Sequence, residues 1–260
     1  MKKYVADWIV TENKRINHDH FLLKVALNES LPEMMPGQFV QIKIADSPNT
    51  FLRRPISIHY ADPLNNEIGL LIQLVGAGTR KLAELRKNSR LNLVFPLGNG
   101  FSLPDKSPSI KRFLLIGGGA GVAPLYFLGS ALLRLGHTPV FLIGAKTAED
   151  LLLIEEYEQL GAVHLTTEDG KVGEKGFVTN HSLLKTNSFD GIYTCGPLPM
   201  MQAVAAYAKS FNYPCEVSLE NRMACGIGAC LCCVENTVSG NRCICTEGPV
   251  MNIEQLTWQI

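Results

Sequence analysis

The sequence predicts an antiparallel β-barrel, followed by an α/β domain with a parallel sheet and by a short cysteine-rich segment. Across positions 1–104, short runs of alternating apolar and polar residues are separated by turn residues, which is typical of a small barrel. From 105 to 212, apolar strands alternate with helical patterns, which favours a parallel sheet covered by helices. Positions 213–260 have too little apolar periodicity for a core of their own, and a bound cofactor would supply the missing stability.

The composition is that of a globular protein without a strong electrostatic preference. Hydrophobic residues make up 46% of the 260 positions, and 24 basic residues balance 24 acidic ones, so we expect no nucleic acid and no membrane surface as partner. Asp7 interrupts the apolar stretch near the N-terminus, which argues against a secretory leader. The uncharged stretch 113–133 contains five glycines and Pro124, which favours strand, loop and helix over a membrane span. We expect a cytoplasmic protein.

In the barrel region the alternating pattern predicts strands at 39–44, 56–60, 68–75 and 91–95. Turn clusters occupy 46–49 and 62–66, and one helix is expected at 79–87. The polar, proline-containing connector 102–109 marks the boundary to the next domain. We therefore divide the chain into domains 1–104, 105–212 and 213–260.

In the α/β region apolar strands are predicted at 113–116, 140–143, 163–166 and 191–194. A helix is expected to begin near Thr147, which stands in capping-box spacing with Asp150, and to end at Gly161.

The cysteines indicate the chemistry. Of eight cysteines, Cys225, Cys230 and Cys233 follow the pattern C-x4-C-x2-C, and Cys245 comes eleven residues later. This is the plant-type spacing for a [2Fe–2S] cluster, and Gly226 and Gly228 would let the backbone curl and aim N–H groups at the sulfurs. A zinc knuckle and unliganded cysteines are the alternatives. Because Cys232 and Cys243 stand close by, spacing alone leaves the ligand set open.

A glycine loop joins the first strand of the α/β region to a helix. Gly117, Gly118, Gly119 and Gly121 precede Pro124, and such a turn presents free N–H groups to a pyrophosphate. The loop does not match G-x-G-x-x-G, because Val122 takes the last glycine position. A tight turn without ligand is the alternative.

A second turn makes a ligand more plausible than an unliganded loop. Cys195, Gly196 and Pro197 end a later strand, and glycine turns at the ends of two parallel strands are typical of a ligand crevice.

Two weaker signals lie in the barrel. Arg53 and Arg54 stand at the start of the sequence Arg-Arg-Pro-Ile-Ser, where an arginine would grip a phosphate with two N–H groups. The glycines at 76 and 78 open the predicted helix and offer a second phosphate seat. A solvated arginine pair is the alternative.

Taken together, these motifs resemble the ferredoxin–NADP reductase superfamily, and more closely the electron-transfer subunits of type B dihydroorotate dehydrogenase. The resemblance covers essentially the whole chain. It rests on LRRPISI at 52–58, VGAGT at 75–79, GGGAGVAP at 117–124, TCGP at 194–197, RMACGIGAC at 222–230 and CTEGPV at 245–250. The last two motifs are the specific ones.

The resemblance implies roles for individual residues. Arg54 would hold the pyrophosphate of FAD, with Pro55, Ile56 and Ser57 against the flavin; Leu71, Ile72 and Gln73 would line the flavin site, and Gly78 and Thr79 would cap the phosphates. The glycine loop with Cys195, Gly196 and Pro197 would bracket NAD. The cluster ligands would be Cys225, Cys230, Cys233 and Cys245, since the family's fourth cysteine precedes an x-x-Gly-Pro-Val stretch.

The resemblance also implies a partner. A catalytic subunit with FMN would oxidise dihydroorotate in pyrimidine biosynthesis, in an assembly of two copies of each subunit, and electrons would pass from FMN through cluster and FAD to NAD. This chain would then need no acid or base of its own, and His20, His59 and His164 would serve packing or surface roles. Glu168 and Asp169 follow a strand end, where an acidic residue disfavours NADP. A reductase with a different redox partner, a redox sensor and a zinc-binding interaction protein are the competing hypotheses.

Overall fold

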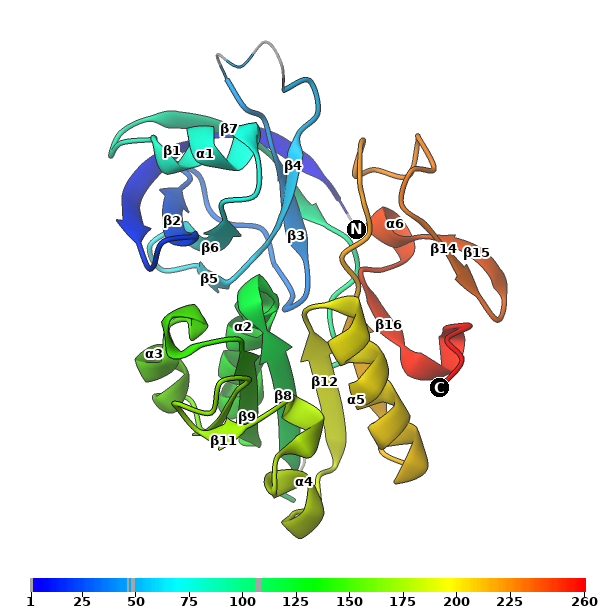
Figure 1. Cartoon of the computed structure of the whole chain (residues 1–260). Helices are drawn as coiled ribbons and strands as arrows, with labels where there is room; N and C mark the ends of the chain where they lie inside the picture. Colours follow the sequence, from blue (N-terminus) through cyan, green and yellow to red (C-terminus); the bar gives the residue numbers. More distant parts are fainter. Residues whose placement is uncertain (1, 46, 48–49, 106–108) are drawn as a thin grey trace.

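The computed structural model describes residues 2–45, 47, 50–105 and 109–260. Figure 1 shows a curled sheet stacked on a second, flatter sheet, with the C-terminal segment beside both. Most of the predicted turn 46–49 and part of the connector 102–109 lie outside the described residues. The predicted fold class is confirmed.

The first sheet has seven strands in the order β4-β3-β7-β1-β2-β6-β5, and every neighbouring pair is antiparallel. Its strands are β1 (Tyr4–Arg15), β2 (His20–Ala26), β3 (Phe39–Ile42), β4 (Arg54–Ser57), β5 (Tyr60–Asp62), β6 (Glu67–Gln73) and β7 (Arg90–Leu97). The edge strand β4 contacts β6 near the opposite edge, so the sheet curls around an apolar core. Trp8 and Phe95 meet edge to face in that core, with ring centroids 4.8 Å apart.

All the predicted elements of the barrel region shift by a few residues at their ends, and two of them differ for a reason that lies elsewhere in the chain. The strand expected at 56–60 is split, because the N–H of Ile58 bonds to Gln38 while that of His59 bonds to Gly69 on the other side of the barrel. The helix is α1 (Ala77–Ala83) rather than 79–87. It ends early because the side-chain amide of Asn13 donates to the carbonyls of Leu82, Ala83 and Leu85.

The second sheet also has seven strands, in the order β11-β10-β9-β8-β12-β13-β16. Its strands are β8 (Arg112–Gly118), β9 (Thr138–Ala145), β10 (Ala162–Thr167), β11 (Glu174–Lys175), β12 (Gly191–Cys195), β13 (Cys215–Ser218) and β16 (Val250–Asn252). All pairs are parallel except β13 with β16. The carboxyl ends of the parallel strands therefore meet at one edge, beneath the barrel.

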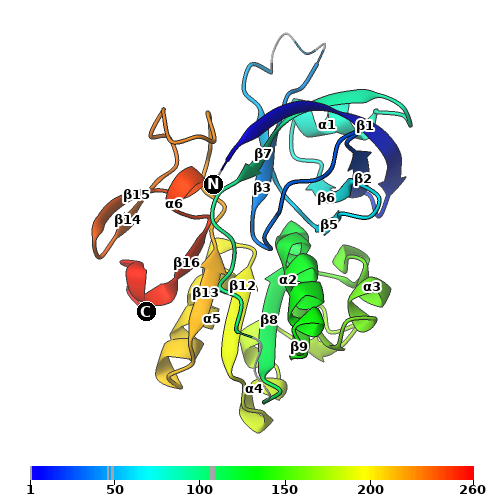
Figure 2. The same ribbon diagram turned by 180° about the vertical axis from the view of Figure 1, so that it is seen from behind.

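Helices cover both faces of this sheet. Figures 1 and 2 show α2 (Ala123–Arg134) and α3 (Ile154–Glu158) on one face, and α4 (Leu183–Thr186) and α5 (Leu198–Ser210) on the other. Short 3-10 turns lie at η1 (Gly119–Val122), η2 (Ala148–Asp150), η3 (Val178–Asn180) and η4 (Ile253–Gln255). The uncharged stretch 113–133 thus forms β8, a glycine turn and α2. Among the helices of the described residues, none has the length and apolar character needed to span a membrane.

The prediction of a single helix that begins near Thr147 and ends at Gly161 is wrong. The capping pair is present, with Thr147 Oγ1 2.9 Å from an oxygen of Asp150, but it opens only η2. Leu153 then takes a left-handed backbone with φ of 56°, and α3 begins at the next residue. This break allows Leu152 and Tyr157 to enter the same apolar core, where Tyr157 Oη donates to the Val122 carbonyl at 2.8 Å.

The C-terminal segment shares its core with the second sheet. It contains the hairpin β14 (Val234–Thr237) and β15 (Gly240–Cys243), followed by α6 (Ile244–Glu247). Cys233, Ile244 and Cys245 pack in one buried cluster with residues of β13 and α5, and β13 and β16 extend the sheet itself. The C-terminal segment therefore packs against the core of the α/β domain. The domain boundary after residue 212 stays a prediction.

A shared apolar core also joins the two sheets. Leu22 and Leu71 of the barrel lie in one buried cluster with Phe113 and Leu125 of the second sheet and its helix. His59 is fully buried at this junction, with Nδ1 3.0 Å from the Ala123 carbonyl and its ring stacked on Tyr126 at 4.6 Å. These contacts fix the barrel above the carboxyl ends of the parallel strands.

Candidate cofactor sites

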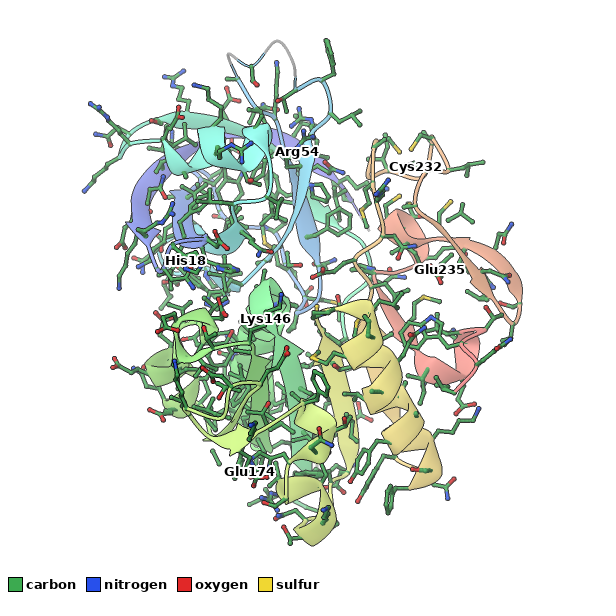
Figure 3. The ribbon with its side chains drawn as sticks, in the orientation of Figure 1. His18, Arg54, Lys146, Glu174, Cys232 and Glu235 are labelled. Carbon is green, nitrogen blue, oxygen red and sulfur yellow. The ribbon has the colours of Figure 1, made fainter. Side chains whose placement is uncertain are left out.

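A cleft of about 890 Å³ lies between the barrel and the carboxyl ends of the parallel strands. The barrel contributes His18, His20 and Gln73, and the second sheet contributes the turns that follow β8, β9, β10 and β12. Figure 3 shows His18 and Lys146 on either side of this junction. The position agrees with the general rule that open α/β sheets bind ligands beyond the carboxyl ends of their strands.

The two glycine turns predicted to bracket a dinucleotide pack directly against each other. A Cβ on Gly121 would lie only 2.5 Å from the Cα and backbone N of Gly196, so no side chain fits there. Gly119 has a φ of +56° and no atom that its Cβ would meet within 4 Å, so the space beside it is open. Backbone N–H groups at such a turn suit a pyrophosphate.

Most of the residues predicted for this dinucleotide line the cleft. Gly118, Gly119, Gly121, Gly196 and Pro197 do so. Gly117 is instead packed against Leu125 and Val122, and Cys195 is only 1% exposed. These last two residues stand behind the wall of the cleft and support its shape.

Polar side chains in the cleft are also available to a ligand. The hydroxyl of Thr166 is buried and has no hydrogen-bond partner within the described part of the chain. Glu168 lines the cleft beside Lys146, whereas Asp169 is paired with Lys171 at 3.6 Å. Of the two acidic residues singled out in the sequence, only Glu168 is therefore placed to contact a ligand.

Glu220 is a cleft residue that the sequence did not reveal. Its Oε1 lies 4.0 Å from Sγ of Cys195, which follows from the end of β13 reaching the same sheet edge as β12. Desolvation raises the pKa of the Glu220 carboxyl, and burial raises that of the Cys195 thiol well above its usual value. Both groups therefore favour their protonated forms more than they would in water. The one feature of the sequence that could have identified Glu220 is its position just after a strand of the parallel sheet.

The two arginines of the barrel have different surroundings. Arg53 donates to the carbonyls of Gln41 and Asn92 and to the side chain of Asn92, so it ties strands of the barrel together. Among the residues that the structure describes, Arg54 donates only to the carbonyls of Leu52 and Arg53. A Cβ on Gly78 would come within 2.8 Å of Nε of Arg54. The Arg54 guanidinium therefore lies against the first turn of α1.

The residues predicted to lie against the flavin occupy β4 and β6, two strands that contact each other. Pro55, Ile56 and Ser57 are half-buried on β4. Leu71 and Ile72 bury their side chains, while Gln73 is exposed to the cleft. Because β5 pairs with β6 only as far as Gly69, residues 70–73 have a strand neighbour on one side alone. Thr79 is buried, and its hydroxyl accepts the N–H groups of Val75 and Gly76.

The cysteine loop aims backbone N–H groups at sulfur. The N–H groups of Ile227 and Ala229 donate to Sγ of Cys225 at 3.4 and 3.3 Å, and that of Gly228 donates to Cys245 at 3.2 Å. The N–H of Cys245 donates to Cys233 at 3.3 Å. Burial raises the pKa of the Cys225 thiol, but hydrogen bonds from the backbone of Ile227, from the backbone and side chain of Cys230 and from the backbone of Ala229 bring it down to about 6. Donors of this kind stabilise thiolates and tune iron–sulfur clusters.

The two additional cysteines lie close to the predicted ligands, and exposure does not separate them, because Cys230 is also exposed and Cys225 is also partly buried. Cys232 is exposed on an outer loop (Figure 3), and Cys243 lies on β15, where its N–H bonds to Glu247. No three His, Cys, Asp or Glu side chains are grouped closely enough to hold one metal ion, as far as the described residues go. The chemistry of the donor set, cysteine sulfurs that accept several N–H groups, fits an iron–sulfur cluster. The assignment of its four ligands stays a prediction.

Comparison with protein families gives two matches. Residues 220–257 match the family described as iron-sulfur cluster binding domain of dihydroorotate dehydrogenase B. Residues 115–206 match the oxidoreductase NAD-binding domain. The first match contains all four predicted cluster cysteines, and the second contains both glycine turns.

Curated proteins match over nearly the full length. The chain is 38% identical to the protein named dihydroorotate dehydrogenase B (NAD(+)), electron transfer subunit, of Shouchella clausii, with 98% of this chain and 99% of that protein covered. It is 36% identical to the protein of the same name from Fusobacterium nucleatum, with 95% and 96% covered.

Solved structures show the same fold. An NADH-dependent reduced ferredoxin-NADP oxidoreductase structure matches with a TM-score of 0.87 and 28% identity, over 97% of this chain and 90% of that one. The cytochrome b5 reductase domain of Ulva prolifera nitrate reductase matches with a TM-score of 0.66 and 20% identity, over 81% of this chain and 94% of that one. The second match supports the fold alone.

Proposed function

Because this chain belongs to the family of NAD(+)-dependent dihydroorotate dehydrogenase B electron transfer subunits, we propose how its own residues hold the three electron carriers. The chain is the electron transfer subunit of an oxidoreductase, and its cofactors are FAD, a [2Fe–2S] cluster and NAD. FAD exchanges electrons singly with a cluster and in pairs with NAD, so it belongs between them. The observation that supports this order is the fold itself, in which the barrel adjoins both the cysteine loop and the NAD cleft.

The FAD site is proposed at the rim of the barrel. Arg54 would hold the pyrophosphate against Gly78, where the absence of a Cβ gives the guanidinium its room. Pro55, Ile56 and Ser57 on β4, and residues 71–73 on β6, would flank the flavin. Thr79 would act indirectly, because its hydroxyl already holds the backbone of Val75 and Gly76 in place.

The NAD site is proposed in the cleft. The N–H groups of Gly118, Gly119 and Gly121 would bind the pyrophosphate, with Gly196 and Pro197 forming the opposite wall. Glu168 would accept a ribose hydroxyl and disfavour a 2′-phosphate. Glu220 would line the cleft in front of Cys195, which stands behind its wall, and both are biased toward their protonated forms.

The cluster site is proposed at Cys225, Cys230, Cys233 and Cys245. The N–H groups directed at Cys225, Cys233 and Cys245 would compensate the negative charge that four thiolates and two sulfides carry. Cys232 and Cys243 would remain free thiols.

The partner is a catalytic subunit of the same enzyme, and we infer that it carries FMN and assembles with this chain as two copies of each. Ile227 and Leu231, on the loop beside the exposed Cys230, are 48% and 63% exposed. Apolar side chains around a redox centre suit a docking face. Replacing both with Asp should abolish co-purification of the catalytic subunit, while Leu64→Asp, at a 94% exposed position in the barrel, should leave it intact.

A cytoplasmic location is inferred from eight free cysteines.

A reductase with a different partner is the alternative function. The solved structure with a TM-score of 0.87 comes from an NADH-dependent reduced ferredoxin-NADP oxidoreductase, which is why this alternative is retained. Co-expression with a dihydroorotate-oxidising flavoprotein distinguishes the two. Reduction of NAD by dihydroorotate in the purified complex supports the main function, and a complex that forms only with another donor supports the alternative.

The first test is the visible spectrum of the chain purified without oxygen, before and after NADH. Flavin bands and a broad iron–sulfur shoulder that both bleach with NADH are expected, with one FAD and two irons per chain. A colourless protein that retains zinc would overturn the assignment.

A further inference from the structure

The side-chain amide of Gln41 is a buried polar group that none of the three proposed sites uses. Gln41 lies on β3, its exposure is 0%, and neither Nε2 nor Oε1 has a hydrogen-bond partner within the described residues. Buried amides nearly always have partners. An unsatisfied one therefore points to a partner that is not part of the polypeptide.

A neighbouring glutamine shows that the barrel does satisfy buried amides. Gln38 is also 0% exposed, yet its Nε2 donates to the Gly98 carbonyl at 2.9 Å and its Oε1 accepts the N–H of Met35 at 2.8 Å. The unsatisfied state of Gln41 is therefore a property of that position and not of the region.

The Gln41 amide touches the cysteine loop. A Cβ on Gly226 would lie 2.7 Å from Nε2 and 2.6 Å from Cγ of Gln41. Gly226 directly follows Cys225 and has a φ of +70°. Because glycine has no side chain, nothing separates the Gln41 amide from the backbone of the loop at this point. On its other side, the backbone of Gln41 pairs with Pro55 of the strand proposed to flank the flavin.

We propose that Nε2 of Gln41 donates a hydrogen bond to a sulfur on the Cys225 side of the cluster and thereby raises its reduction potential. The proposal rests on the cluster assignment above. The amide would join the N–H groups of Ile227 and Ala229, which already donate to Cys225. Donors to sulfur stabilise the reduced cluster, which carries one more negative charge, relative to the oxidised one.

The test is an EPR-monitored dithionite titration of the full chain with its cluster, comparing wild type with Gln41→Met. Methionine keeps the length of the side chain and removes the donor. The reduced-to-oxidised ratio at a fixed potential should fall about tenfold, which is a shift of about 59 mV for one electron, and the g-values should change. Gln38→Met is the matched control. It removes an amide whose partners are in the protein, so it should lower the unfolding midpoint and leave the potential unchanged.

A second measurement does not depend on whether the variant folds. The wild-type chain labelled with ¹⁵N in its glutamine side chains should show a hyperfine coupling between that nitrogen and the reduced cluster. An unchanged potential in Gln41→Met, or the absence of this coupling in the wild type, would overturn the proposal. In either case, the EPR signal of a [2Fe–2S] cluster in the wild type would leave the proposed function standing, and only its absence would remove both.

Discussion

The guanidinium of Arg54 lies against Gly78, close enough that a single added carbon on Gly78 would come within 2.8 Å of Nε. The contact joins the first residue of β4 to the first turn of α1, two elements that are separated in sequence by β5 and β6. Arg53, one residue earlier, is held by Asn92 and Gln41 instead. The barrel therefore uses one arginine for its own structure, and we predict that the next one binds a ligand.

Gly78→Ala is expected to displace the Arg54 guanidinium and to weaken FAD binding about tenfold, equivalent to about 1.4 kcal/mol. Titration of the FAD-free chain, followed by flavin fluorescence, measures the Kd. Gly76→Ala is the matched control, because a Cβ there meets nothing within 4 Å. Equal FAD affinity in the two variants would contradict a phosphate seat at Arg54.

Gly121→Ala should impair reduction by NADH without loss of FAD or cluster. The new methyl group would lie 2.5 Å from the backbone of Gly196, so the two turns must separate and the N–H groups no longer converge. We expect the KM for NADH to rise about tenfold or more. Gly76→Ala, at an extended backbone where a Cβ meets nothing within 4 Å, controls for the added methyl group. A normal KM in Gly121→Ala would show that the pyrophosphate binds elsewhere.

Glu168→Gln should narrow the preference for NADH over NADPH. The carboxylate lines the cleft, and removing its charge lessens repulsion of a 2′-phosphate beside Lys146. The ratio of kcat/KM for the two nucleotides should fall about fivefold to tenfold, or about 1 kcal/mol. Asp169→Asn, which alters a residue paired with Lys171, should leave the ratio unchanged. If the wild type used NADPH as fast as NADH, the inference about Glu168 would be withdrawn.

Glu156, at the junction between the two sheets, makes the stability of the fold depend on pH. The nearby His59 imidazole, with Nε2 3.8 Å from Oε2, lowers the pKa of this carboxyl from its usual 4.5. Because the folded pKa lies below the unfolded one, the pair stabilises the fold above pH 4.5, and that stability is lost as the pH falls through the folded pKa.

The carboxyl is partly exposed, so its contribution is small, about 0.5 kcal/mol. Urea unfolding at pH 7 should show Glu156→Gln to be less stable than wild type by that amount, and the difference should vanish under acidic conditions. Glu155→Gln, on the exposed side of the same helix, should show no such dependence. A difference that persists in acid would assign the effect to packing.

Local sequence patterns predicted the parts of the molecule that local interactions determine. The sequence alone predicted the strand, glycine turn and helix of 113–133 and the cysteine motif, because each depends on residues that are close together in the sequence. The end of α1 was not predictable, since it depends on an amide that Asn13 supplies from β1. The break before α3 likewise depends on where Leu152 and Tyr157 find their core.

The site shows the same division. The glycines and cysteines can be recognised in the sequence by their residue type and spacing. Glu220 and Gln41 can be identified only from the positions of the strands in the folded protein. Glu220 meets Cys195 because β13 lies beside β12. Gln41 meets Gly226 across the junction of the barrel and the C-terminal segment. Neither residue type carries a motif, so only the three-dimensional arrangement identifies them.

The apolar core shared by the two sheets has a kinetic consequence. Leu22, Leu71, Phe113 and Leu125 are buried together, and the fully buried His59 bonds across the same junction. Moving the barrel away from the α/β domain would expose this whole core to water. Because the cysteine segment is also packed on the α/β core, we predict that the fold fixes the distance between the proposed flavin and cluster sites, without a domain movement. Electron transfer within the chain should accordingly be insensitive to the viscosity of the solvent, whereas the entry and exit of NAD should slow as glycerol is added.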